Sequence, residues 1–282
     1  MLSLALAALS GLVWGVGDFA GGKAAQTAPA LTVTLTSKIN CLPFLAVYLV
    51  VLYVPVVPAS LPWGAAGGFC GVLGLVVFYR AMAAGAMTVV APVAAVVSAL
   101  LPVIVGLASG ERPGAVRLFG VGCALAAIVL VTLVPAPPGS TRRITPQLIG
   151  LAVLAGLGFG LFFLCLDRAG SQGAPGLWPI LAAQLTGIAA VGLLVLLLRP
   201  VGGRPRGRAL AWTLVAGPFD MTANALYLEA TRWGDLSLVA PLAALYPVST
   251  VILALLVDRE RLRGLQILGL GLALAALVLV SR

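Results

Sequence analysis

The residues of this chain that could do chemistry lie inside long apolar segments. Asp220, Asn224 and Tyr227 follow the spacing i, i+4, i+7, so on a helix they point in one direction. An apolar helix has no structural need for such a stripe, which favours a stripe that faces the interior of a bundle or a water-filled cavity. Hydrogen bonds that only hold neighbouring helices together are the alternative. We expect this stripe to form one wall of a binding site.

A second carboxylate lies near the N-terminus. Gly11, Gly15, Asp18 and Gly22 share one helical face, and the three glycines let another helix approach closely. Asp18 is then expected on a protein-facing stripe, where an intramembrane carboxylate is a functional candidate. The alternative is that Asp18 lies at the membrane interface or caps a turn.

Lys38 is the corresponding basic residue inside an apolar segment. Counted from the short connection between the first two helices, Lys38 and Asp18 lie at similar depths in the membrane, so we expect them to form an ion pair. This pair either lies near the substrate or is purely structural. Gln184 takes the equivalent position in the second half of the chain, which favours a site facing a cavity.

Two prolines are expected to interrupt a later apolar segment. Pro241 and Pro247 remove backbone donors on either side of Tyr246, and Pro92 and Pro102 occupy the corresponding segment of the first half. Paired interruptions of this kind mark the binding sites of many transporters, although plain kinks are the alternative.

The composition places these residues in a membrane. Hydrophobic residues make up 61% of the 282 residues and charged residues 9%, against about 25% charged in a soluble domain. The chain has no His, and its four Cys are scattered in apolar runs, so we expect no metal, no cofactor and no catalytic centre. The net charge of +9 comes from short loops, which favours topology determination over nucleic-acid binding.

The sequence predicts an all-α integral membrane protein with ten membrane-spanning helices. A spanning helix needs about 20 largely apolar residues, and the expected segments are residues 2–20, 30–52, 62–83, 87–108, 115–134, 147–167, 176–198, 209–229, 236–257 and 263–280.

The chain also repeats itself. Residues 63–131 align with residues 212–280 at one constant offset, and weaker matches extend the repeat upstream. This predicts a first five-helix repeat over residues 1–134, a linker over 135–146 and a second repeat over 147–282. Because five is odd, the second repeat is expected to enter the membrane with the opposite orientation.

Lys and Arg predict the orientation. Most of them lie in the odd-numbered connections, which places those connections in the cytoplasm and both termini outside. We expect a bacterial inner (plasma) membrane location, and a monomer or a homodimer in the bilayer.

The order of several short motifs resembles that of a known family. These are Trp14-Gly15, Gly110-Glu111 and Arg259-Glu260 before glycine-spaced helices, and Val-Ala-Pro near the start of the fourth and ninth segments. Together they resemble the EamA-like branch of the drug/metabolite transporter superfamily over the whole chain. Phe159-Gly160 departs from the pattern, because it stands where the first half has Trp14-Gly15.

The resemblance implies a secondary transporter that exports or exchanges a small metabolite, amino acid or drug, with protons as one possible coupling ion. It leaves the substrate open. The predicted substrate-binding residues are Asp18, Trp14, Lys38, Gln184, Asp220, Asn224, Tyr227 and Tyr246.

Two further readings come from the acidic residues. Gly15-Val16-Gly17-Asp18 spells a GxGD pattern, so the alternative function is an intramembrane aspartyl protease with Asp220 or Asp167 as second carboxylate. The repeat has no explanation under that alternative. Glu111 and Glu260 recur next to Arg at equivalent helix ends, where we expect helix capping or an ion pair.

Overall fold

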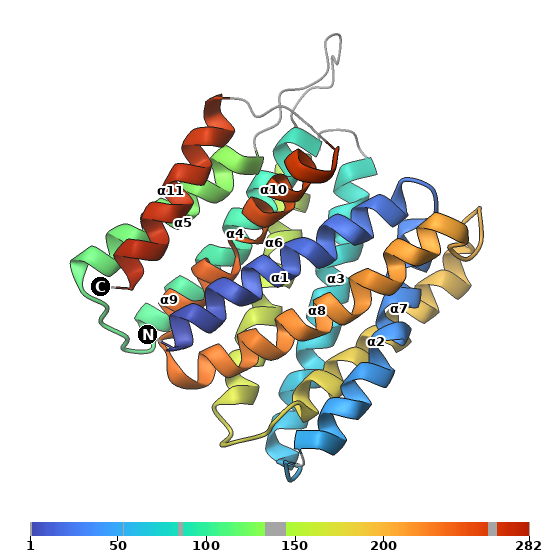
Figure 1. Ribbon diagram of the computed structural model, residues 1–282, viewed down its shortest axis with the longest axis horizontal. Coiled ribbons are helices and arrows are strands. Elements are labelled where there is room, and N and C mark those ends of the chain that lie inside the picture. Colours follow the sequence, from blue (N-terminus) through green and yellow to red (C-terminus); the bar gives the residue numbers. More distant parts are fainter. Residues whose placement is uncertain (1, 53, 84–86, 133–144, 259–263, 282) are drawn as a thin grey trace.

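The described chain is built of helices, with no strand in the ranges that the structure describes. The computed structural model describes residues 2–52, 54–83, 87–132, 145–258 and 264–281. In chain order (Figure 1) the elements are α1 (Leu2–Ala25), α2 (Ala30–Leu52), the 3₁₀ turn η1 (Pro58–Ser60), α3 (Leu61–Ala83), α4 (Met87–Ala108), α5 (Ala115–Thr132), α6 (Pro146–Gly170), α7 (Trp178–Leu198), α8 (Gly207–Trp233), α9 (Leu236–Ala243), α10 (Tyr246–Asp258) and α11 (Gly264–Val280).

The all-helical membrane fold agrees with the predicted one. In the described part of the chain, six helical segments are long and apolar enough to cross a membrane, and three shorter apolar segments lie in α4, α5 and α11. The helix α8 is the longest of all but carries the predicted polar stripe, which lowers its mean hydropathy.

The predicted ninth helix is broken into α9 and α10 at Ala244 and Leu245. Pro247 has no N–H to donate to the carbonyl of Ala243, and its ring crowds that carbonyl, so α9 ends there. The free Ala243 oxygen lies against Gly11 of α1, where a Cβ would approach it to 2.8 Å. The predicted interruption is therefore present between Pro241, which lies inside α9, and Pro247. The corresponding interruption at Pro92 and Pro102 is wrong, because α4 runs unbroken from Met87 to Ala108.

The ends of α1 and α8 differ most from the predicted ones. The segment Gly21-Gly22 was expected to end the first helix, but α1 continues to Ala25, because a glycine costs a helix only about 1 kcal/mol. The helix α8 extends to Trp233, and Glu229 and Arg232 pair along its last turn at 2.7 Å. Most of the predicted linker, and the pair Arg259-Glu260, lie outside the described residues.

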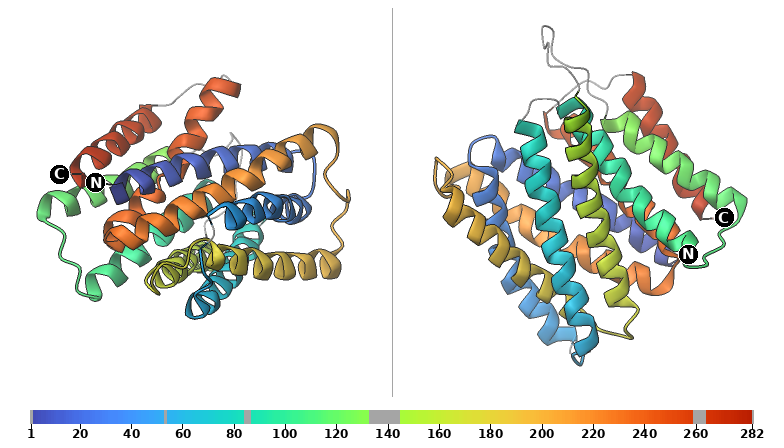
Figure 2. Two further views of the ribbon diagram at one scale, coloured as in Figure 1. Left: turned by 60° about the horizontal axis from the view of Figure 1, so that its bottom comes forward. Right: turned by 180° about the vertical axis from the view of Figure 1, so that it is seen from behind.

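The helices of the two halves pack reciprocally. The helix α1 lies along α8, and its counterpart α6 lies along α3; α2 contacts α8, as α7 contacts α3; α5 and α11 contact each other. Figures 1 and 2 show α5 and α11 side by side at one edge of the bundle, with the two chain termini close together. The main contacts of one half therefore have counterparts in the other.

The reciprocity extends to single glycines. A Cβ on Gly68 of α3 would overlap the carbonyl oxygen of Ala183 in α7, and a Cβ on Gly217 of α8 would overlap that of Ser37 in α2. The sequence repeat pairs Gly68 with Gly217. Because glycine has no side chain, the helix backbones approach closely at both equivalent points.

The outer surface suits lipid. The exposed side chains include Val50 and Val51 of α2, Leu196 and Leu197 of α7, and Leu274 of α11, each at least 66% exposed. In a water-soluble protein, contiguous apolar surface of this kind is rare outside binding sites. The bundle therefore presents its apolar side chains outward, where a bilayer covers them.

Candidate functional site

The core of the bundle contains an aromatic cluster formed by three helices. The Trp14 ring of α1 lies 5.4 Å from that of Phe163 in α6 and 5.8 Å from that of Tyr227 in α8, and the last two rings are 5.0 Å apart. All three side chains are buried. The cluster brings two predicted site residues together and joins both halves of the chain.

Asp18 lies one turn beyond Trp14 on the same face of α1. It is exposed, although its neighbours Gly17 and Phe19 are buried. A Cβ on Gly17 would lie 3.3 Å from the backbone nitrogen of Asp220, so α1 and α8 touch at this level. Asp220 is half-buried, and its charge acts on that of Asp18. The fold thus brings the two predicted carboxylates into one accessible neighbourhood.

The other two residues of the α8 stripe are less accessible. Asn224 is 5% exposed and donates from Nδ2 to the carbonyl oxygen of Asp220 at 2.6 Å. Tyr227 is fully buried, and its hydroxyl lies 3.4 Å from the carbonyl oxygen of Phe163. Asp220 is therefore the most accessible member of the stripe in this conformation, whereas Asn224 and Tyr227 are buried.

Lys38 of α2 is bound to Gln184 of α7. Its Nζ donates to Gln184 Oε1 at 3.1 Å, and a Cβ on Gly187 would lie 3.4 Å from the same nitrogen. Gln184 is 3% exposed. The ion pair expected between Lys38 and Asp18 is not formed within the described residues, because the packing of α2 against α7 places Gln184 beside the ammonium group.

We expect the Gln184→Leu substitution to lower the free energy of unfolding by about 1–3 kcal/mol, because it leaves the half-buried ammonium group of Lys38 without its acceptor. The double substitution Lys38→Met with Gln184→Leu should recover most of this loss. Thermal unfolding in detergent measures both. The control in the same helix is Thr186→Val, since the Thr186 hydroxyl donates to the carbonyl oxygen of Ala182 in the preceding turn. Equal losses in the single and double variants would contradict a direct interaction.

Tyr246 begins α10 directly after the helix break. Its carbonyl oxygen accepts hydrogen bonds from the hydroxyls of Ser249 and Thr250 at 2.9 and 3.1 Å. The same hydroxyls lie 3.2 and 3.4 Å from the carbonyl oxygens of Gly11 and Gly15 in α1. The side chain of Tyr246 is half-buried and interacts electrostatically with Asp18. The break therefore lies against the stretch of α1 that leads to Asp18.

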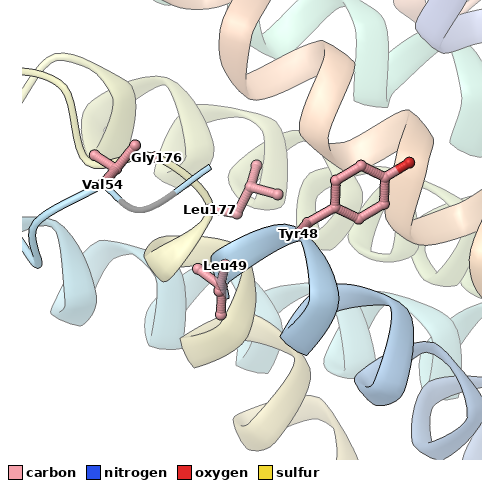
Figure 3. A pocket seen from close by; sticks show the side chains of 5 residues that line it. All are labelled: Tyr48, Leu49, Val54, Gly176 and Leu177. Atoms are coloured by element: carbon pink, nitrogen blue, oxygen red, sulfur yellow. The ribbon is translucent and has the colours of Figure 1, made fainter. Parts of the chain in front are cut away.

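A small pocket lies away from these residues. It is lined by Tyr48 and Leu49 near the end of α2, by Val54, and by Gly176 and Leu177 before α7 (Figure 3). The indole nitrogen of Trp178 donates to the carbonyl oxygen of Val54 at 2.8 Å and joins the two segments. No charged side chain lines this pocket, so we do not assign the candidate site to it.

The sequence did not single out two important residues. Phe163 completes the aromatic cluster, but in the sequence it is one of many phenylalanines in apolar runs, one turn after the Phe159 that aligns with Trp14. Asn40 donates from Nδ2 to the carbonyl oxygen of Leu214 at 2.9 Å and ties α2 to α8. Its position two residues from Lys38 was the available signal.

Comparison with known proteins agrees with this architecture. The sequence model of the EamA-like transporter family matches residues 144–282. The second half of the chain belongs to the EamA-like transporter family. The chain is also similar to a solved crystal structure that is titled only as that of a protein. The two superpose with a TM-score of 0.77 over 99% of this chain and 98% of the other, at 17% sequence identity. That likeness shows the fold over both halves. No curated protein matches the sequence.

Membership in the EamA-like family identifies a multi-pass membrane protein of the drug/metabolite transporter type. The family resemblance drawn from the sequence motifs is therefore confirmed. The aspartyl protease alternative finds no support, because the matched family is one of transporters.

Proposed function

We propose that this protein is a secondary transporter that moves a small molecule across the membrane by alternating access, with Asp18 and Asp220 as the residues that bind it. The observation that carries the proposal is the meeting of these two reachable carboxylates on neighbouring apolar helices. Carboxylates at such positions are costly, and they mark substrate and ion pathways in membrane proteins.

The architecture supports alternating access. The reciprocal contacts between the halves, down to the pair Gly68 and Gly217, are those expected of an inverted repeat. The break between α9 and α10 lies beside the candidate site, where a discontinuous helix is typical of transporters. Two similar halves that meet at a central site can rock between an inward-facing and an outward-facing arrangement.

The charges near the site favour a substrate with an ammonium group. Asp18 and Asp220 are acidic, and the nearby ammonium of Lys38 is already bound to Gln184. An ammonium group is also the feature that amino acids and many amine drugs share. Protons are the proposed coupling ion, since a carboxylate that releases a cation can take up a proton in exchange. We also propose that the protein lies in the bacterial inner membrane and that both chain termini are on the outer side of that membrane.

Flux into proteoliposomes tests this function. The panel contains amines, amino acids and their uncharged analogues, each measured with and without a pH gradient, and a peptide-cleavage assay runs on the same protein. We expect saturable flux of the ammonium-bearing compounds that a pH gradient drives, and no cleavage. Flux equal to that of protein-free liposomes throughout the panel would refute transport, while faster flux of the uncharged analogues would refute the substrate class.

A further inference from the structure

Glu111 connects the two halves of the chain outside the candidate site. It lies in the connection between α4 and α5, and its two carboxylate oxygens accept hydrogen bonds from the backbone nitrogens of Leu236 and Ser237 at 2.8 and 2.9 Å. These are the first residues of α9, in the second half. The first turn of a helix has free N–H groups and a positive potential, so a carboxylate stabilises it. The helix capping expected of Glu111 is present, but on the other half.

The surroundings of Glu111 are shaped to hold the carboxylate in place. A Cβ on Gly106 would lie 2.5–3.0 Å from the carboxylate atoms, so glycine makes the room that they occupy. The backbone nitrogen of Glu111 donates to the carbonyl oxygen of Gly106 at 3.1 Å, and Arg112 donates to that of Leu107 at 3.0 Å. Asp235, which precedes α9, makes no capping hydrogen bond of its own. Glu111 therefore supplies the cap that the second half lacks.

The capped helix leads directly to the candidate site. All eight residues of α9 are buried, and at 1.5 Å per residue they span about 12 Å. Its far end, Ala243, lies against Gly11, and Tyr246 follows the break. Beyond the break, α10 is partly exposed, as is Asp18. The helix α9, which Glu111 caps, is thus wholly buried, whereas α10 beyond the break is not.

We propose that the Glu111 carboxylate is a latch that holds closed the face carrying both chain termini, and that each transport cycle requires its bonds to α9 to break and re-form. The proposal rests on the proposed alternating access. One further feature supports rearrangement at this end: the Ser237 hydroxyl is buried with no hydrogen-bond partner among the described residues. A buried hydroxyl without a partner is costly, and opening this end would admit water to it.

Accessibility of a reporter cysteine tests the latch. The reporter is Ser3→Cys in a background without the four native cysteines, because Ser3 is 7% exposed and packs against Gly234 beside α9. We expect Glu111→Gln to raise the labelling rate of this cysteine by a membrane-impermeant maleimide about tenfold, since the charge-assisted hydrogen bonds are weakened. The control Ser237→Ala keeps the backbone N–H and removes the unpartnered hydroxyl, so it should not raise the rate.

A second reporter separates opening from general loosening. Thr32→Cys lies 6% exposed near the start of α2, at the opposite end of the bundle. Faster labelling at position 3 without a rise at position 32 supports the latch; an equal rise at both, or none at position 3, overturns it. The assay needs no substrate. A wild-type protein that transports nothing in the panel refutes the proposed function, whereas unchanged labelling in an active protein refutes only the latch.

Discussion

Substituting Asp18 or Asp220 with asparagine is expected to reduce transport by about tenfold to a hundredfold. Asparagine keeps the shape of the side chain and removes the charge, and hydrogen bonds to charged groups are worth about 1.5–3 kcal/mol. Each variant should still insert and unfold near the wild-type temperature, because neither carboxylate is an ion-pair partner in the described part of the structure. Initial flux in proteoliposomes with matched protein content measures the effect.

Two variants give this experiment its controls. Glu229→Gln removes a carboxylate from the same helix as Asp220, but one that is bound to Arg232 and Trp233 at the helix end, so its flux should stay close to that of the wild type. Asp18→Glu keeps the charge on a longer side chain and should retain part of the activity. Normal flux in both Asp18→Asn and Asp220→Asn would show that the substrate binds elsewhere.

The second large effect is expected from the glycines at the helix crossings. Gly68→Ala and Gly217→Ala should each lower the free energy of unfolding by about 1–3 kcal/mol or more, because the added methyl group overlaps a backbone carbonyl of the facing helix. A backbone carbonyl in a packed helix cannot move aside as a flexible side chain does. Thermal unfolding in detergent, together with the yield of inserted protein, measures the loss.

The matched control is Gly122→Ala. Gly122 is exposed on α5, and no atom lies within 4 Å of an added Cβ. Alanine is a better helix former than glycine, so this variant should be as stable as the wild type or more so. If Gly68→Ala and Gly217→Ala behaved like Gly122→Ala, the close approach of α3 to α7 and of α8 to α2 would be wrong. Unequal losses at Gly68 and Gly217 would show that the equivalent crossings of the two halves differ in energy.

Much of the fold follows from the sequence because its causes are local. A segment of about 20 apolar residues must become a helix in lipid, where each backbone polar group needs a partner in its own segment. Helix ends are less well determined. Gly21-Gly22 lies inside α1 and Glu229 inside α8, because a helix tolerates single unfavourable residues when the surrounding packing supports it.

Much less of the candidate site could be predicted. The spacing of Asp220, Asn224 and Tyr227 correctly placed them on one face, but Asp220 is reachable while Tyr227 is buried under the rings of Trp14 and Phe163. Periodicity shows the direction in which a side chain points and not what lies in front of it. The assignment of these residues to substrate binding remains a prediction.

The sequence by itself determined the membrane class, the repeat, the position of the helix break between Pro241 and Pro247, and the polar face of α8. Each of these features depends on residues that are close together along the chain, or on the constant offset at which the two halves of the sequence align. Only the tertiary structure decided which partners meet: Lys38 binds Gln184 and not Asp18, and Glu111 caps a helix of the other half. The physical reason is that these contacts join residues more than 100 positions apart, and their choice depends on how the helices cross.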